Sequence, residues 1–116
     1  SPDFGLLDYQ FSPRFAYASV SALVSALAGA SYLETLAESE STHLYLFQKG
    51  EDLILAGFTL DEEKTGARVR HDARSLLAID EMGNRREIPA GDPLDLVLDG
   101  YPRYWLFQGA SRVALP

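Results

Sequence analysis

The sequence predicts a mainly β fold, an antiparallel two-sheet β-sandwich preceded by one amphipathic α-helix. After residue 30, seven or so short apolar stretches alternate with turns rich in glycine, asparagine, aspartate and proline. Several of these stretches are apolar on both alternating faces, which is typical of strands covered on both sides. Residues 13–28 instead repeat their apolar positions at a helical spacing.

The helix has a clear beginning and end. Ser12 can cap free backbone N–H groups, and Pro13 suits the first helical position. Apolar residues follow at i, i+3, i+4 and i+7 between Val20 and Leu27, and Gly29 suits the left-handed residue that ends a helix. The polar stripe carries only small serines, so we expect both sides of the helix to pack, against something larger than the rest of this chain.

The strands follow in order, separated by recognisable turns. The stretches 49–52 and 81–84 contain glycine, so we expect each to join the two strands of a β-hairpin. Residues 94–98 alternate three leucines with Asp95 and Val97, as a strand does. The expected strands are 31–36, 43–48, 53–60, 67–70, 75–80, 85–88, 94–98, 103–107 and 113–115.

Composition and charge exclude several classes of function and of partner. The 116 residues are 47% hydrophobic and 23% charged, with a formal net charge of −7. Nucleic-acid binding needs a clustered basic face, so we expect no nucleic-acid partner. No apolar run reaches the ~20 residues that span a bilayer, so we expect no membrane partner. Cysteine is absent, which excludes disulfides and thiolate zinc sites. Secreted, periplasmic and cytoplasmic locations all fit.

No catalytic, cofactor-binding or metal-binding residue is predicted. The carboxylates cluster in predicted loops and turns, where acidic residues keep a surface solvated. His43 and His71 stand outside any metal-ligand spacing. A Gly-x-Ser-x-Gly motif and a phosphate-binding glycine loop are both missing. We therefore expect no cofactor, and no enzyme activity from this chain alone.

Aromatic residues are the candidates for ligand or interdomain contacts, because an aromatic ring offers an apolar face and tyrosine and tryptophan add a polar tip. Tyr104 and Trp105 are adjacent, so in a strand they point to opposite faces. One of them would be core and the other would cover a neighbouring domain or a sugar. The predicted contact residues are Tyr9, Tyr101, Tyr104 and Trp105.

Two ordered sets of motifs resemble the C-terminal part of a (β/α)8-barrel glycoside hydrolase, which comprises the last barrel helix and a β-sandwich accessory domain. In such enzymes an "F-G-L-x-D" strand end precedes an "x-P-K/R-P-A-Y-x-A" helix start and an "L-x-G-A" exit, followed by a sandwich with "D-x-x-G-N" and "P-x-Y" segments. Phe15 stands where a second proline is usual. The matching stretches are 4–8, 12–17, 27–30, 78–84, 88–91, 94–98 and 101–104.

The resemblance implies that this chain carries a structural part of the enzyme and that the catalytic residues lie elsewhere in the parent protein. Residues 1–30 would end the barrel domain and residues 31–116 would form the C-terminal sandwich. The catalytic carboxylates would lie on earlier barrel strands that this chain lacks, in a parent protein that is a glycosidase. The abrupt start, without an initiator methionine, also leads us to expect a piece of a longer protein.

Three functions therefore stay open. The first is a non-catalytic module that packs on and stabilises a catalytic barrel of the same protein. The second is an independent carbohydrate-binding module for an oligo- or polysaccharide. The third is a protein-interaction module that self-associates through an exposed helix.

Overall fold

The computed structural model describes residues 27–80 and 82–116. These residues form nine short strands, most of them rich in the β-branched, aromatic or leucine side chains that pack on a pleated surface. The strands are β1 (Ser31–Glu38), β2 (His43–Lys49), β3 (Asp52–Phe58), β4 (Thr65–His71), β5 (Ser75–Ile79), β6 (Arg85–Ile88), β7 (Leu94–Leu98), β8 (Arg103–Gln108) and β9 (Val113–Ala114).

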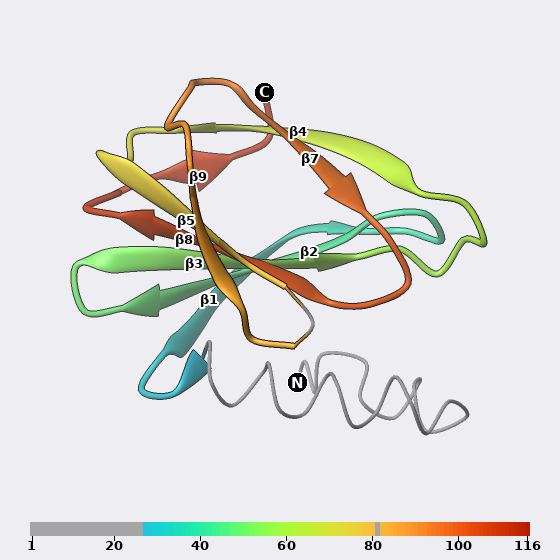
Figure 1. Ribbon diagram of the computed structural model, residues 1–116, viewed down its shortest axis with the longest axis horizontal. Coiled ribbons are helices and arrows are strands. Elements are labelled where there is room, and N and C mark those ends of the chain that lie inside the picture. The colour runs from blue at the N-terminus through green and yellow to red at the C-terminus, as the bar shows by residue number, and fades with distance from the viewer. Residues whose placement is uncertain (1–26, 81) are drawn as a thin grey trace.

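The strands build two antiparallel sheets, which confirms the predicted sandwich. The larger sheet has the order β1-β2-β3-β8-β5-β6, and the smaller has the order β7-β4-β9. Figure 1 shows the three-stranded sheet lying over one face of the six-stranded sheet. We call the face between the sheets the inner face, and the opposite face of the six-stranded sheet the outer face.

Both predicted hairpins are confirmed. β2 pairs with β3, and β5 pairs with β6, in antiparallel register. Their turns contain Gly50 and Gly83 at φ values of 63° and 84°, a backbone conformation that residues with a Cβ rarely adopt. Asp80 also holds the second turn, because its carboxylate accepts hydrogen bonds from the backbone N–H groups of Met82 and Asn84.

Several strand ends differ from the predicted bounds, because pairing rather than local composition sets them. β1 runs two residues further than expected, since its end still pairs with β2. β4 begins two residues early, since Thr65 pairs with Leu98 of β7. β3 stops at Phe58, because the next backbone N–H, of Thr59, donates to the Asp99 carbonyl instead of continuing the ladder.

The inner faces of the two sheets pack into one apolar core. The alternation of leucines in β7 serves this core, because Leu96 and Leu98 are buried while Val97 on the other side is 58% exposed. The small sheet adds Val69 and Val113, and the loop between β8 and β9 adds Ala110. The large sheet adds the remaining buried members, Leu44, Leu46, Leu53, Leu55, Leu76, Trp105 and Phe107.

The outer face of the large sheet carries a second apolar cluster. Its buried members are between 1% and 4% exposed, as deeply buried as the inner core. Among residues 27–80 and 82–116, no strand lies over this face (Figure 1). We call these seven side chains the outer-face cluster: Tyr45, Phe47, Ile54, Ala56, Phe58, Ile79 and Tyr104.

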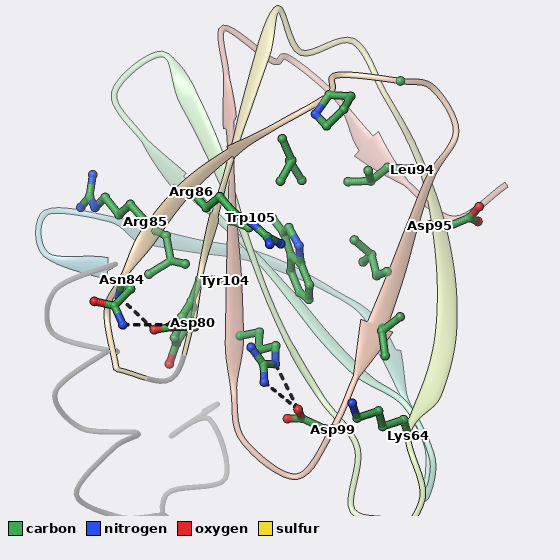
Figure 2. Close-up of a pocket in the computed structure, with 18 residues that line it drawn as sticks. Lys64, Asp80, Asn84, Arg85, Arg86, Leu94, Asp95, Asp99, Tyr104 and Trp105 are labelled. Carbon is green, nitrogen blue, oxygen red and sulfur yellow. Dashed lines mark hydrogen bonds and ion pairs between the residues drawn. The ribbon is translucent and has the colours of Figure 1, made fainter.

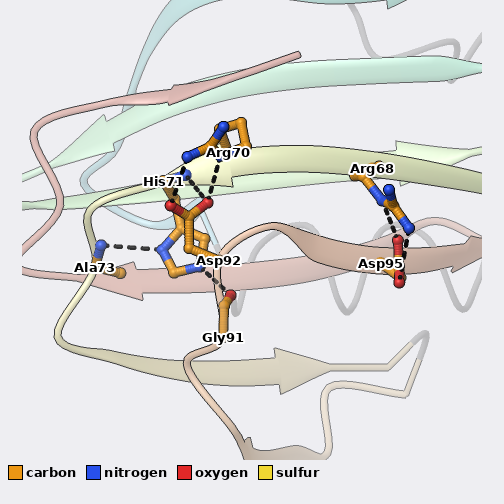
Figure 3. Close-up of polar contacts among 7 residues, drawn as sticks. All are labelled: Arg68, Arg70, His71, Ala73, Gly91, Asp92 and Asp95. Carbon is orange, nitrogen blue, oxygen red and sulfur yellow. Dashed lines mark hydrogen bonds and ion pairs between the residues drawn. The ribbon is translucent and has the colours of Figure 1, made fainter. Parts of the chain in front are cut away.

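The small sheet presents a polar surface instead. Arg68 of β4 pairs with Asp95 of β7 at 2.7 Å, and Arg70 pairs with Asp92 at 2.9 Å (Figure 3). All four side chains are at least 36% exposed. The sandwich therefore has one solvated face and one apolar face.

The predicted helix at 13–28 lies almost wholly outside the described residues, and no helix is present within them. It therefore stays a prediction, as does the boundary between residues 30 and 31. Leu27 and Ala30 do pack against the outer-face cluster, and the backbone N–H of Ala30 donates to the Leu27 carbonyl. In the described part of the chain, no helix is long and apolar enough to cross a membrane.

Candidate functional site

A row of side chains crosses the inner face of the six-stranded sheet and ends at its edge strand. The register places Leu55 of β3 beside Trp105 of β8. Trp105 in turn faces Ala78 of β5, and Ala78 faces Arg86 of β6. Directly paired residues point to the same face, so Arg86 points inward like the buried Trp105. An arginine therefore ends an apolar row at the open edge of the sandwich.

A cavity of about 790 Å³ opens at this edge, between β5–β6 of the large sheet and β7 of the small one. The sheets have six and three strands, so the small sheet does not close the gap beside β6. Figure 2 shows Arg86 and Trp105 inside this gap, with Leu94 on the β7 side. Ile88 and Leu94, both half-buried, contribute apolar walls.

The three carboxylates that line the cavity already have partners. Asp99 pairs with Arg103 at 2.7 Å, and Asp95 pairs with Arg68 on the solvent side of β7. Burial raises the pKa of Asp80, but hydrogen bonds from Asn84 and Met82 outweigh it and hold that pKa below its usual value. Hydrogen bonding and the positive charge of Arg68 lower the pKa of Asp95 as well. All three carboxylates therefore already have hydrogen-bond or ion-pair partners within the chain.

Two cationic side chains at the cavity lack such a partner. Within the described residues, Arg86 and Lys64 make no ion pair or hydrogen bond through their side chains. Figure 2 shows Lys64 at the end of the cavity where Asp99 lies. Arg85 also lines the cavity but points away from it, because it pairs with Ile79 of the outer face. The cavity therefore offers unpaired positive charge beside apolar walls.

The structure places three of the four predicted contact residues. Tyr104 belongs to the outer-face cluster and Trp105 to the inner core, so they point to opposite faces as expected. Tyr104 is 2% and Trp105 6% exposed, and both are among the residues that line the cavity. Tyr101 is half-buried against the outer-face cluster. Tyr9 lies outside the described residues, and all four contacts stay predictions.

Burial of the Tyr104 ring raises the pKa of its hydroxyl above the usual value of 10.0, so the phenol stays neutral. The two strands that flank β8 hold this side chain in place, because Tyr104 pairs with Ala56 on one side and Ile79 on the other. A neutral, buried tyrosine is a packing residue of the outer face rather than an acid or base.

The two histidines have structural surroundings. His71 accepts a hydrogen bond at Nδ1 from the Ala73 backbone N–H and donates from Nε2 to the Gly91 carbonyl, at 3.0 and 2.7 Å (Figure 3). This arrangement needs the neutral ring, which joins the β4–β5 turn to the loop before β7. His43 stacks on Phe58 with ring centres 4.6 Å apart. Within the described residues, no three acidic or histidine side chains gather as a metal site.

Sequence reasoning missed Arg86 and Lys64 as site residues. The pair Arg85–Arg86 is conspicuous in the sequence, but alternation alone shows only that the two point to opposite sides of a strand. Which of them points inward depends on the pairing of β5 with β8, a contact between distant parts of the chain. The sequence therefore shows the two adjacent arginines, but only the strand register shows which of them faces the cavity.

Comparisons with known proteins support the fold. No family model matches the chain, and no curated protein matches it. The solved structure of a family 39 glycoside hydrolase from the gut symbiont Bacteroides cellulosilyticus WH2 is similar, with a TM-score of 0.64 and 24% sequence identity. The match covers 80% of this chain and 20% of that one, so this chain spans about a fifth of that enzyme's length.

Proposed function

We propose that the chain is the non-catalytic C-terminal β-sandwich module of a glycoside hydrolase, which packs on and stabilises a catalytic (β/α)8 barrel of the same protein. The observation that carries this proposal is the outer-face cluster. A sheet that is apolar on both faces is covered on both faces. The small sheet covers the inner face, which leaves the outer face for the barrel side of the protein.

The contrast between the two outward surfaces supports this orientation. The small sheet faces outward with ion pairs and the 58%-exposed Val97, and the large sheet faces outward with aromatic and aliphatic side chains. Tyr32 of β1 extends the apolar surface, because it packs edge-on against Phe47 at 5.9 Å and is still 43% exposed. A partner of the module would therefore meet the six-stranded sheet.

The proposed domain boundary agrees with these contacts. Leu27 and Ala30 lie at the end of the proposed barrel part, residues 1–30, and contact the outer-face cluster. The chain thus reaches the sandwich on the same side that the proposal assigns to the barrel. In this arrangement Tyr101 and Tyr104 are interdomain or packing contacts of the outer face. Fold similarity to one segment of a glycoside hydrolase is consistent with the same assignment.

Activity measurements on two lengths of the protein test the proposal. The full reading frame that encodes this chain should contain two carboxylates at the ends of barrel strands and should hydrolyse a nitrophenyl glycoside. The 116-residue chain alone should show no turnover. Turnover by the 116-residue chain, abolished by replacing one of its own acidic residues, would contradict the proposal, as would a reading frame without a barrel.

A protein-interaction module is the alternative proposal. In that case the chain would self-associate through an exposed helix instead of packing on a barrel. Sedimentation of the product of the full reading frame separates the two. A monomer with glycosidase activity fits the barrel module, and a reversible dimer without glycosidase activity fits the interaction module.

A further inference from the structure

The two sheets have four edge strands among the described residues, and three of these are protected against pairing with another strand. β6 carries three charged residues out of four, and β9 is only two residues long. β1 pairs with β2 through two register shifts, after Tyr32 and after Thr35. Charge, short length and bulges are the features that keep a sheet edge from accepting a further strand.

β7, the fourth edge strand, has none of these features. Its five residues pair with β4 without a register shift, and its single charged residue, Asp95, is already paired with Arg68. In an antiparallel pair, alternate residues direct their backbone N–H and C=O groups away from the partner strand. Along residues 94–98, the described part of the chain supplies no other partner for these groups. β7 therefore offers a regular row of backbone donors and acceptors to a further strand.

The cavity of about 790 Å³ lies on the free side of β7. Leu94 and Leu96 of β7 line it together with Ala78 of β5 and Ile88 of β6, and the described lining includes no residue of β4 (Figure 2). Side chains alternate along a strand, so every second residue of a strand added to β7 would point into this cavity. Such a strand would bond the free backbone groups of β7 and fill the cavity with its inward side chains.

Arg86 indicates the chemistry of one of those inward side chains. It points into the cavity beside Trp105, and within residues 27–80 and 82–116 its side chain has no ion-pair or hydrogen-bond partner (Figure 2). A carboxylate matches a guanidinium through two parallel hydrogen bonds. Lys64 lies at the opposite end of the lining, so this carboxylate would meet Arg86 alone.

A second copy of β7 would not supply such a carboxylate. The inward residues of β7 are Leu94, Leu96 and Leu98, and Asp95 faces outward and holds Arg68. Two copies joined at β7 would therefore leave both Arg86 side chains without a partner. The geometry favours a strand of different sequence, with apolar residues at its inward positions and an acidic residue at one of them.

We propose that β7 accepts an extended peptide segment of a partner protein as an additional strand, with an acidic side chain of that segment on Arg86. In strand addition, backbone hydrogen bonds provide the affinity and pockets for alternate side chains provide the specificity. β7 belongs to the small sheet, and the outer-face cluster lies on the far side of the large sheet. The inference therefore does not rest on the proposed packing against a barrel.

Fluorescence anisotropy of a labelled peptide measures this binding to the 116-residue chain. The probe is Ser-Val-Thr-Glu-Thr-Val-Ser, whose valines and glutamate share one face of a strand. We expect it to bind saturably, and we expect the peptide with glutamine in place of glutamate to bind about tenfold more weakly, because a hydrogen bond to a charged group is lost. A third peptide, with methyl groups on three consecutive backbone nitrogens, should not saturate, because it cannot donate to the β7 ladder.

Two further measurements assign the binding to β7 and Arg86. The Arg86→Gln chain should bind the glutamate and glutamine peptides equally, whereas Arg85→Gln, which changes the opposite face of β6, should keep the tenfold preference of about 1.4 kcal/mol. Amide hydrogen exchange of the unmodified chain needs no substitution. Bound peptide should slow the exchange of amides within residues 94–98 and leave the amides of β1 unchanged.

Four results would overturn the inference. The first is an absence of saturable binding, and the second is a bound peptide that slows exchange elsewhere but not in β7. The third is an Arg86→Gln chain that is folded and still prefers the glutamate peptide. The fourth is slow exchange in β7 that depends on the concentration of the chain itself without peptide, which would identify a second copy as the occupant. None of these results bears on the barrel-packing proposal, which is tested by glycosidase activity and by protection of the outer face.

Discussion

Gly57 of β3 lies where three inner-core side chains meet. A Cβ at this position would be 2.8 Å from Leu44, 2.9 Å from Leu98 and 3.2 Å from Trp105. Real Cβ contacts essentially never fall below 3.0 Å, so a side chain here must displace its neighbours. The missing side chain therefore leaves room for Leu44, Leu98 and Trp105 to pack against β3.

We expect Gly57→Ala to lower the free energy of unfolding by about 1–3 kcal/mol, the usual cost of overpacking a core. Urea unfolding measures the change. Gly66→Ala is the matched control, because it lies in a strand of the same fold and its Cβ would meet nothing closer than 4.0 Å. Equal effects at the two positions would mean that crowding at Gly57 is not what requires the glycine.

Asp72 ties the β4–β5 turn to the chain before β9. Its carboxylate accepts hydrogen bonds from the Ser111 hydroxyl at 2.5 Å and the Arg112 backbone N–H at 3.0 Å. The Ser111 hydroxyl first, and the Arg112 N–H second, lower the Asp72 pKa from 3.8 to about 2. The folded chain therefore binds this proton less readily than the unfolded chain does.

The lowered pKa sets the sign of a pH effect. The stability contributed by Asp72 is fully present above about pH 4 and is lost as the pH falls through 2. We expect Asp72→Asn to lower the midpoint of unfolding at pH 7 and to flatten the loss of stability between pH 4 and pH 2. Glu63→Gln, at an exposed loop position, should change neither. If the Asp72→Asn variant lost as much stability as the unmodified chain between pH 4 and pH 2, this account would be contradicted.

The individual strands differ in how well the sequence predicts them. The alternating leucines of residues 94–98 predict a strand, and the turns at Gly50 and Gly83 predict two hairpins. β4 is harder to predict, because its first residues, Thr65 and Gly66, have no apolar pattern and are held by pairing with β7. Long-range pairs such as β3 with β8 leave no local pattern, so sheet order and the inward direction of Arg86 require the structure.

The faces of β2 and β7 give opposite expectations for substitutions. Phe47 of β2 is 3% exposed within the outer-face cluster, whereas Val97 of β7 is 58% exposed on the polar side of the small sheet. Phe47→Ala should cost about 3–5 kcal/mol of unfolding free energy, and Val97→Ala less than about 0.5 kcal/mol. Chemical denaturation measures both. A Phe47→Ala cost as small as that of Val97→Ala would mean that the outer face is not a packed surface.

Over the whole molecule, the central claim is that the sandwich is asymmetric. Its small sheet turns charged side chains outward, and its large sheet carries apolar clusters on both faces. The sequence predicts strands that are apolar on both faces, because Leu44 and Leu46 alternate with Tyr45 and Phe47. It does not predict which sheet carries the second cluster, since that depends on how nine strands divide between two sheets.

Cysteine labelling tests this claim most directly, because the chain has no cysteine of its own. Tyr32→Cys places a thiol on the rim of the outer face, and Val97→Cys places one on the solvated side, at positions that are 43% and 58% exposed. Both thiols should react readily with a maleimide in the 116-residue chain. In the product of the full reading frame, we expect the thiol at position 32 to react at least tenfold more slowly and the thiol at 97 to react at the same rate. Equal reaction at position 32 in both proteins would contradict the account.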